Sequence, residues 1–517
     1  MVMLVEPEER RFLGLLSRMS HANPFLPERI ELERELLGDD AVSTAPVWSK
    51  ESDLVSDRAN IEKLFARVEP LANRLRERMA EGATAEPGDL DLYDDLILYL
   101  LYYRFHDEFR TAIANSQDVA APPVVPHWEP FLETFRRYYE TPGRPAPVAH
   151  DPAHLFAGFF QVRRAFHHIY HFIVGASMPA ARLRAAVWQS IFTHELRRYR
   201  RTLYKSLGDI TTLISGPSGT GKELVARAIG LSRYIPFDVK QRRFTELFHA
   251  SFYPLNLSAL SPTLIESELF GHCRGAFTGA VGDRQGWLEV CTPLGTVFLD
   301  EIGELDPSIQ VKLLRVLQSR MFQRLGESSD RRFPGKIIAA TNRDLAADML
   351  SGSFRQDFYY RLCSDMIRTP ALHEQLADQP ADLYNLVRFI TQRIADEEAE
   401  SIAQEVVEWI EGHLGSDYPW PGNIRELEQC VRNVMIRREY LPPPCAPTPT
   451  VHPISEALAR CELSADQLLR MYCTYAYQKI GSFEQTAKAL QLDRRTVKSK
   501  VDEELLETLQ AEFERPS

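Results

Sequence analysis

The sequence predicts a multidomain protein in which an α/β core lies between a mostly helical N-terminal region and a small all-α C-terminal domain. The length of 517 residues is too great for a single ordinary domain. Between about Arg182 and Pro370, helical patterns alternate with short β-rich runs, which is typical of a parallel sheet covered by helices on both faces. Six prolines within Leu441–Pro453 then predict an extended linker before the last domain.

Composition excludes several classes of protein. Apolar residues make up 44% of the chain and charged residues 26%, as expected of packed domains and not of a disordered chain. The 72 acidic and 60 basic residues give a net charge of −12, so DNA contact is expected only at a local basic module. The longest apolar run, Leu96–Tyr103, is too short for a bilayer, and the acidic start leaves no signal peptide, so we expect a cytoplasmic protein without a membrane partner. Seven cysteines without a C-x-x-C pair predict reduced thiols.

Residues 1–170 are expected to be mostly helical. Apolar side chains recur at three- and four-residue spacing from Ile61 to Met79, which predicts one buried helical stripe. Further helical stretches are expected at 91–114, 128–140 and 152–173. The last of these carries a histidine cluster that either ligates a metal or haem or consists of packed groups: His167, His168 and His171.

The core is expected to contain strands separated by helices. The β-rich runs are Ile210–Ser215, Phe252–Leu257, Thr296–Asp300 and Lys336–Thr341. After Pro370 such runs disappear, and helical periodicity continues to Tyr440. The pattern therefore predicts a helical subdomain that follows the sheet.

The first of these strands leads into a glycine-rich loop and then a helix. In such a loop the glycines let backbone N–H groups surround a phosphate, and the helix N-terminus adds its positive end. Lys222 is placed to reach the β- and γ-phosphate oxygens. The alternative is a glycine-rich turn without a ligand. Expected nucleotide contacts are Gly216, Pro217, Ser218, Gly219, Thr220, Gly221, Lys222 and Glu223.

A later strand ends in two carboxylates. Asp300 is expected to hold Mg²⁺, and Glu301 to polarise the attacking water. An apolar strand that ends in acid is often only structural, but its occurrence after a phosphate-binding loop predicts a nucleoside triphosphatase.

Between these two motifs lies the hexapeptide GAFTGA, residues 275–280. Glycines that flank an aromatic residue and a threonine predict an exposed, flexible tip. GAFTGA is the signature loop of the sigma-54-dependent transcription activators, a family of AAA+ ATPases, and the chain resembles this family over roughly 172–440. In the family, glutamate follows the P-loop lysine, as Glu223 does here. The resemblance implies ATP and Mg²⁺ as cofactors and a sigma-54 contact through Gly275, Ala276, Phe277, Thr278, Gly279 and Ala280.

The resemblance also assigns roles outside these motifs. Val174 and Gly175 are similar to the segment near the nucleotide base, and Asn256 to the residue that restrains the catalytic glutamate. Asn342 resembles the sensor of the γ-phosphate. Arg425 resembles the lid residue that contacts nucleotide, although a simple helix-cap arginine is the alternative.

Two further arginines, Arg355 and Arg361, lie in a segment that resembles the arginine-finger region. An arginine supplies delocalised positive charge to a transferring phosphoryl group, and when a neighbouring subunit offers it, hydrolysis depends on assembly. The resemblance therefore implies a homo-oligomeric ring, a hexamer. The alternative for either arginine is a surface salt bridge.

Three segments depart from the family pattern. Arg197–Gly208 and Arg233–Ser251 are longer than the family usually has, and the sequence assigns them no role. Ala371–Gln375 stands where the family has a leucine- and arginine-rich run, at the junction of core and lid.

The C-terminal region predicts a helix-turn-helix. Helices are expected at 464–480, 483–490 and 494–501, with Val497 and Val501 inward and basic residues outward, as entry into a major groove requires. The module resembles the Fis-type domain of the same family, although a solvated basic face is the alternative. Expected contacts with double-stranded DNA are Arg494, Arg495, Thr496, Lys498 and Lys500.

The expected organisation is a regulatory domain of unassigned signal, an AAA+ core, a helical lid, a proline-rich linker and a DNA-binding domain, at residues 1–170, 171–370, 371–440, 441–455 and 456–517. The leading interpretation is an ATPase that binds upstream DNA and remodels the closed complex of the sigma-54 RNA polymerase holoenzyme. The alternatives are a DNA-binding regulator that keeps the ATPase domain as a scaffold, and a remodeller of another protein.

Overall fold

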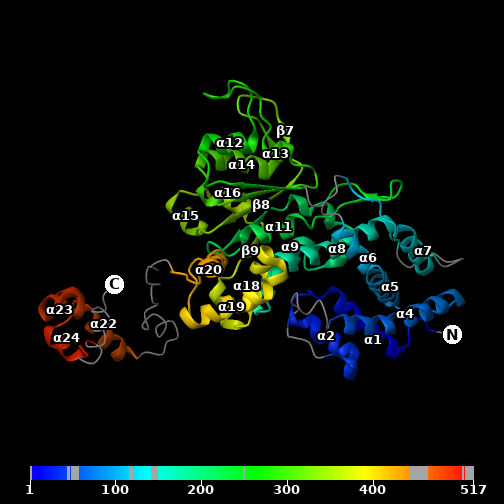
Figure 1. Ribbon diagram of the computed structural model, residues 1–517, viewed down its shortest axis with the longest axis horizontal. Coiled ribbons are helices and arrows are strands. Elements are labelled where there is room, and N and C mark those ends of the chain that lie inside the picture. The colour runs from blue at the N-terminus through cyan, green and yellow to red at the C-terminus, as the bar shows by residue number, and fades with distance from the viewer. Residues whose placement is uncertain are drawn as a thin grey trace. The chain divides into compact units, whose positions relative to one another are not determined.

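The computed structural model describes residues 3–42, 47, 57–115, 121–140, 149–247, 251–442, 464–502 and 506 (Figure 1). The chain divides into two compact units, Met1–Tyr440 and Leu441–Ser517. The expected proline-rich linker lies almost entirely outside the described residues.

A five-stranded parallel sheet forms the centre of the first unit, in the order β4-β5-β8-β1-β9. The strands are β1 (Thr212–Ser215), β4 (Phe252–Asn256), β5 (Thr296–Asp300), β8 (Lys336–Thr341) and β9 (Asp365–Arg368). The four expected strands are confirmed to within two residues, whereas the edge strand β9 was not expected. It has four residues and buries only Ile367 among them, so its sequence carries little β-pattern.

Helices cover both faces of this sheet, as the alternating pattern predicts. Along β1, Ile214 packs on one side and Leu213 on the other, and β8 alternates in the same way. The first face is covered by α9 (Met178–Phe192) and α11 (Lys222–Gly230). The second face is covered by α12 (Pro262–Phe270), α14 (Pro307–Ser319) and α16 (Gln356–Leu362). Shorter helices α13 (Trp287–Val290) and α15 (Leu345–Ser351) complete the core.

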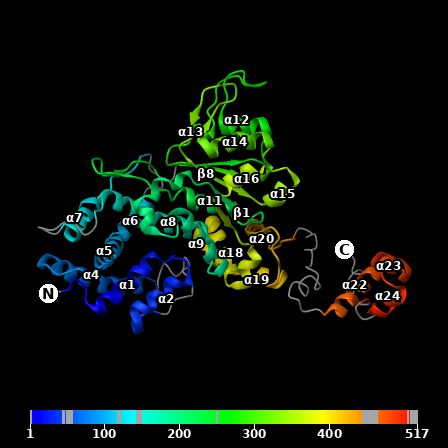
Figure 2. The ribbon, with the colours of Figure 1, turned by 180° about the vertical axis from the view of Figure 1, so that it is seen from behind.

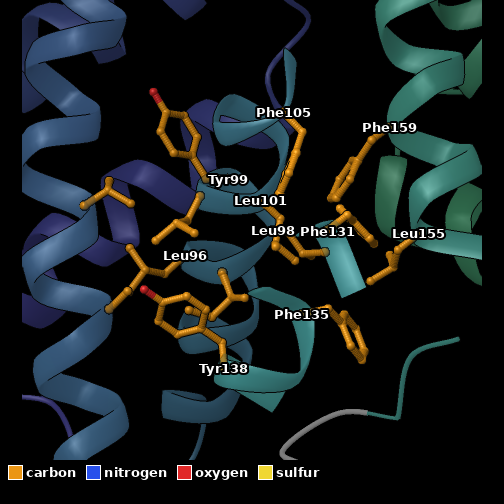
Figure 3. Close-up of a cluster of buried hydrophobic side chains, with 14 of the residues drawn as sticks. Leu96, Leu98, Tyr99, Leu101, Phe105, Phe131, Phe135, Tyr138, Leu155 and Phe159 are labelled. Carbon is orange, nitrogen blue, oxygen red and sulfur yellow. The ribbon is translucent and has the colours of Figure 1, made fainter. Parts of the chain in front are cut away.

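The N-terminal part of this unit is helical, as expected. Its helices are α1 (Pro7–His21), α2 (Pro27–Leu37), α4 (Asp57–Glu81), α5 (Asp89–Arg104), α6 (His106–Ala114), α7 (Trp128–Tyr139) and α8 (Pro152–Phe172). The stretch expected at 91–114 is two helices that part at the buried Phe105. Side chains from α5, α7 and α8 point toward one another in an aromatic-rich core (Figure 3).

Helix α8 belongs to two hydrophobic cores. Leu155, Phe156 and Phe159 near its start pack among the N-terminal helices. Ala165 and Ile169 near its end pack with α9, α11 and the sheet. Figures 1 and 2 both show α8 beside α9 and α11. Helix α8 therefore joins the N-terminal helices to the sheet domain, because its residues are part of both cores.

The two segments longer than the family pattern attach the N-terminal helices to the sheet. The first contains α10 (Leu196–Arg201) and two short 3₁₀ turns, and its Arg197 forms an ion pair with Asp95 of α5. The second contains a hairpin of β2 (Phe237–Asp238) and β3 (Arg243–Phe244), whose phenylalanines are buried in the N-terminal core. A second hairpin, β6 (Met321–Phe322) with β7 (Arg331–Arg332), places Phe322 in the core on the second face of the sheet.

The expected helical subdomain follows the sheet as α17 (Leu372–Asp378), α18 (Asp382–Ala395), α19 (Ala399–His413) and α20 (Asn423–Arg437). These helices share their own core, which includes Val387, Val406, Trp420 and Val431.

The second unit contains α22 (Ala465–Ile480), α23 (Phe483–Leu490) and α24 (Arg494–Lys500). Val497, Cys473 and Ala487 are buried, and Tyr477 stacks on Phe483 with ring centroids 4.0 Å apart. The five cysteines within the described parts of the chain are free thiols. None of the helices in those parts has both the length and the apolar character that crossing a bilayer requires.

Candidate nucleotide site

A phosphate-type loop connects β1 to α11 at the carboxyl edge of the sheet. Gly219 has φ +77°, and a Cβ there would lie 2.2 Å from the carbonyl oxygen of Gly422. A Cβ on Gly216 would lie 2.1 Å from Thr369 Oγ1. Only glycine allows this backbone at both positions, because any side chain would collide with the lid or with the residue after β9. The close fit explains the glycine spacing of the motif.

The first residues of α20 close over this loop. The amide of Asn423 donates to the carbonyl oxygen of Ser218 at 3.0 Å, and Arg425 Nη1 donates to Ser218 Oγ at 3.2 Å. The backbone N–H of Arg425 also reaches the Gly219 carbonyl oxygen. Asn423 has φ +53°, and its side-chain oxygen accepts from the N–H of Leu372, so one residue joins the loop, the lid and the junction segment.

Lys222 lies at the base of the loop. Its ammonium group donates to the carbonyl oxygens of Gly216 and Pro217, each at 3.1 Å. Burial lowers the pKa of Lys222, and the nearby charges of Glu301 and Asp300 oppose that effect. The lysine therefore faces both carboxylates from across the site.

The remaining loop residues make internal contacts. Thr220 Oγ1 lies 2.7 Å from Thr369 Oγ1 and donates to the Pro217 carbonyl oxygen. Glu223 pairs with Arg227 one turn along α11, at 2.8 Å.

Asp300 is the last residue of β5, and Glu301 follows it. Burial raises the pKa of Asp300, and the charge of Glu301 adds to the increase. Glu301 has φ +56°, a conformation that non-glycine residues adopt rarely, and its Oε2 accepts from the N–H of Asn342 at 3.4 Å. Two carboxylates that repel one another in a half-buried position form a donor set that fits Mg²⁺, since a hard divalent cation prefers such oxygens.

Asn256 lies beside Asp300, because the two residues are paired in the register of β4 and β5. Its side-chain oxygen accepts from the N–H and the hydroxyl of Ser258, at 3.0 and 2.8 Å. Among the described residues, no hydrogen bond joins Asn256 to Glu301.

The segment that contains Val174 and Gly175 is held by the lid. Asp382, the first residue of α18, accepts from the N–H groups of Ala176 and Ser177 at 2.7 and 2.9 Å. Arg184 is fully buried and donates to the Gly175 carbonyl oxygen at 2.7 Å. Sequence reasoning missed Asp382 and Arg184, and also Thr369 and Asn423. The only sequence signal was the Trp-Pro-Gly-Asn run at 420–423, which predicts a helix start and not a contact with Ser218. Asp382 and Thr369 lie far along the chain from the motifs that they contact, and no motif includes Arg184.

Arg355 and Arg361 are exposed on or beside α16. Arg355 pairs with Asp357 at 2.7 Å, which raises the pKa of Arg355 through the hydrogen bond and the charge of that carboxylate. Within the described chain, neither guanidinium contacts the P-loop of its own subunit.

The GAFTGA hexapeptide forms a closed turn. The N–H of Gly275 donates to the Ala280 carbonyl oxygen at 2.9 Å, and that of Ala280 to the Phe277 carbonyl oxygen at 3.0 Å. Thr278 is exposed, as expected, but Phe277 is half-buried with its ring 5.0 Å from that of His272. The expectation of an exposed tip therefore does not hold for Phe277, because pairing with Arg284 and Leu325 brings His272 to the neck of the loop.

The basic residues of α24 divide into two groups. Arg494, Arg495 and Lys498 are exposed, and Thr496 is half-buried. Lys500 forms an ion pair with Asp466 of α22, so the expectation of an outward Lys500 was wrong. The helix ends at Lys500, where the chain turns back toward α22 and Asp502 bonds to Thr474.

The histidine cluster lies near the C-terminal end of α8. His168 is buried, which lowers its pKa well below the usual value, and the rings of His167 and His171 stack 6.0 Å apart. No group of metal-ligating side chains suited to an ion occurs in the described parts of the chain.

A parallel sheet with a P-loop after β1, carboxylates after β5 and a helical lid over the loop defines an AAA+ nucleotide-binding domain. Residues 191–368 match the model of the Sigma-54 interaction domain, and residues 377–440 that of the AAA+ ATPase lid domain. The chain therefore carries the AAA+ ATPase domain of the sigma-54-dependent transcriptional activators.

Curated relatives agree with this assignment. The chain is 41% identical to the Nif-specific regulatory protein of Azotobacter vinelandii over 266 residues. This alignment covers 48% of this chain and 47% of that protein. It is 42% identical over 235 residues to the transcriptional regulatory protein ZraR of Escherichia coli K12, over 45% of this chain and 49% of the relative. The matches thus span about half the length of these relatives. Among solved structures, NtrX from Brucella abortus in complex with ATP is 24% identical, with 72% of this chain and 80% of that chain covered and a TM-score of 0.39.

Proposed function

We propose that the chain is an ATP-driven transcriptional activator of the sigma-54 RNA polymerase holoenzyme. The observation that carries the proposal is the closure of the P-loop by Asn423 and Arg425, opposite the Asp300 and Glu301 carboxylates. This arrangement offers a phosphate cradle, a cation and a general base within one site.

In the proposed mechanism, Lys222 exchanges its two carbonyl partners for phosphate oxygens when ATP binds. Asp300 would hold Mg²⁺, which supplies positive charge to the transferring phosphoryl group. Glu301 polarises the attacking water. Its carboxylate also accepts a hydrogen bond from the N–H of Asn342, so a movement of this γ-phosphate sensor would move Glu301 as well. Asn256, paired in register with Asp300, would restrain Glu301 before hydrolysis by turning its side chain from Ser258 to that carboxylate.

Assembly into a homo-hexameric ring completes the site. Arg355 and Arg361 are exposed and lie away from their own P-loop, as residues that act on a neighbouring subunit must. The Arg355–Asp357 pair would have to open when Arg355 contacts that neighbour's nucleotide.

The GAFTGA turn contacts sigma-54, and α24 contacts upstream DNA. Thr278 is exposed at a tip whose neck is closed by backbone hydrogen bonds, which suits a rigid contact point. An exposed basic face on α24 consists of Arg494, Arg495 and Lys498, with Thr496 at its edge. Lys500 is not part of this face, because its ion pair with Asp466 joins α24 to α22.

The N-terminal helices regulate the ATPase, with repression as the resting state. The support is their attachment to the sheet domain through α8 and the two inserted segments. A signal that alters the N-terminal core would reach the ATPase through these contacts.

Thr278→Ala tests the proposed coupling. The variant should hydrolyse ATP at the wild-type rate and fail to form open complexes with the sigma-54 holoenzyme, since Thr278 has no contact with the nucleotide site. Val281→Ala, at a position 90% exposed just beyond the loop, is the matched control and should retain both activities.

Three outcomes would contradict this function. Wild-type open-complex formation by Thr278→Ala would move the sigma-54 contact elsewhere. Absence of ATP hydrolysis by the wild type would favour the scaffold alternative. Hydrolysis without any open-complex formation by the wild type would favour a remodeller of another protein.

A further inference from the structure

A second cavity lies at the opposite edge of the sheet from the nucleotide site. Its volume is about 470 Å³, within the range of small-molecule sites. Lys336, the first residue of β8, lines it, and so do residues that precede β1 and β5, including Leu207 and Leu294. The P-loop, Asp300 and Asn342 all lie at the other ends of these strands, so the cavity and the nucleotide site are separate.

Both inserted segments contribute walls to this cavity. Tyr199, Tyr204 and Lys205 come from the first, and Arg233 and Tyr234 from the second. His154, from the first turn of α8, completes the wall on the side of the N-terminal helices. The cavity therefore exists only where the N-terminal helices and the sheet domain meet.

The cavity has an excess of positive charge. Asp151 caps α8 by accepting from the Ala153 N–H, and Asp209 pairs with Arg320 at 2.9 Å, so both lining acids are engaged. The lining cations are Lys205, Arg233 and Lys336, and within the described chain none of them forms an ion pair with a carboxylate.

Among the residues that the structure describes, the two inner cations donate hydrogen bonds only to backbone oxygens. Lys336 is buried and donates to the carbonyl oxygens of Ile210 and Leu207, at 2.6 and 3.5 Å, and Arg233 donates to that of Gly295 at 2.5 Å. Burial lowers the pKa of Lys336 to about 7. A buried ammonium without a carboxylate partner is costly, and an anion in the cavity would offset that cost.

Three rings form one side of the cavity. The centroids of Tyr204 and His154 are 4.3 Å apart, those of Tyr204 and Tyr234 4.7 Å, and those of His154 and Tyr234 5.2 Å. His154 is fixed by hydrogen bonds to the Tyr234 hydroxyl and the Arg200 carbonyl oxygen. A fixed aromatic wall beside cations favours a ligand with a flat ring and an anionic group.

We propose that this cavity binds a small anion that carries a planar ring, with the ring against Tyr204 and Tyr234 and the anionic group toward Lys205, Arg233 and Lys336. Such a ligand would touch both inserted segments and α8 at once. It would therefore bind the assembled junction more tightly than either part alone.

The test is a calorimetric titration of the full chain with three probes: phenyl phosphate, inorganic phosphate and phenol. ADP at saturation keeps the P-loop occupied throughout. We expect phenyl phosphate to bind once per chain, with a Kd about tenfold lower than that of either fragment probe, because it satisfies both the ring wall and the cations.

Variants locate the site. Lys205→Ala, at an exposed position, should raise the Kd of phenyl phosphate about fivefold or more, and Tyr204→Leu should remove its advantage over inorganic phosphate. Lys240→Ala removes the same charge from an exposed position in the second insertion and should change nothing, since Lys240 does not line the cavity. Lys336→Met is a further variant, to be read only if its far-ultraviolet spectrum is that of the wild type.

Several results would overturn the proposal. These are no binding of phenyl phosphate in the presence of ADP, an unchanged Kd in Lys205→Ala, or equal affinity for phenyl phosphate and inorganic phosphate. Failure of the sigma-54 function would leave these measurements unaffected, because none of them uses hydrolysis or transcription as a readout.

Discussion

The two edges of the parallel sheet differ in how their residues are brought together. At the carboxyl edge, the P-loop, the Asp300–Glu301 pair and Asn342 lie in short contiguous motifs at the ends of β1, β5 and β8. At the amino edge, the cavity is built from six separate stretches of chain, between Asp151 and Lys336. The site at the carboxyl edge can thus be recognised from short sequence motifs, whereas the cavity at the amino edge forms only when distant segments come together in the fold.

This difference has a functional consequence. Substitutions at the carboxyl edge should change hydrolysis itself, whereas those at the amino edge should change how the N-terminal helices are attached and leave the chemistry intact. The following predictions run from the largest expected effect on hydrolysis to the smallest.

The largest effect is expected for Arg355→Ala and Arg361→Ala. Loss of an arginine finger should reduce ATP hydrolysis by about 10³- to 10⁵-fold, as measured by phosphate release. In mixtures, each mutant subunit should also inhibit its wild-type neighbours. Arg432→Ala, at an exposed position on the lid, serves as the control. Activity proportional to the wild-type fraction at every mixing ratio would contradict action in trans.

Glu301→Gln should reduce hydrolysis by about 10²- to 10⁴-fold and leave ATP binding intact, because the amide cannot polarise water but keeps the size of the side chain. Fluorescent nucleotide binding and phosphate release measure the two properties separately. Glu304→Gln, an exposed neighbour paired with Arg343, should behave as the wild type. Normal turnover by Glu301→Gln would show that another residue is the base.

Phe237→Ala addresses the amino edge. Phe237 is 7% exposed and packs on Trp128 and Phe156, so its truncation should lower the free energy of unfolding by about 3 kcal/mol or more in urea titrations. Hydrolysis without inducer should be equal to or above that of the wild type, since the contact belongs to the proposed repressing domain. Val239→Ala, 46% exposed in the same insertion, is the control. Loss of hydrolysis in a folded Phe237→Ala protein would contradict the division between the two edges.

Lys498→Ala should have no effect on ATP hydrolysis, because Lys498 lies in the C-terminal unit and belongs to neither edge of the sheet. It should weaken DNA binding and reduce the slope of log K against log salt by about 0.9 if one phosphate contact is lost. Lys479→Ala, exposed on α22, is the matched control in gel-shift titrations. An unchanged salt slope would remove α24 from the DNA contact.

The contrast between the edges also explains what the sequence could predict. The strands β1, β5 and β8, the P-loop and the carboxylates were predictable because glycine spacing and apolar runs that end in acid are local patterns. The contacts made by Asp382 and Asn423 were not predictable, since their partners Ala176 and Ser218 lie more than two hundred residues away in the chain.

The inserted segments show the same limit. Phe237 and Phe244 stand in a stretch with no clear periodicity, and only the N-terminal core explains why they are apolar. Lys500 was misassigned for a related reason: helical periodicity places it on the outer face, but α24 ends there and the side chain turns to Asp466.

Helix α8 connects the N-terminal helices to the helix that follows the P-loop, α11. Its 21 residues make a rod about 32 Å long, held at one end by the N-terminal core and at the other against α11, the helix that begins with Lys222. A rod of this kind transmits rotation and translation with little loss, because its backbone hydrogen bonds resist bending. A tilt of a few degrees, imposed among the aromatic side chains near Phe156, would therefore displace the far end by about an ångström or more, which is about the positional tolerance of a group that acts on a bound substrate.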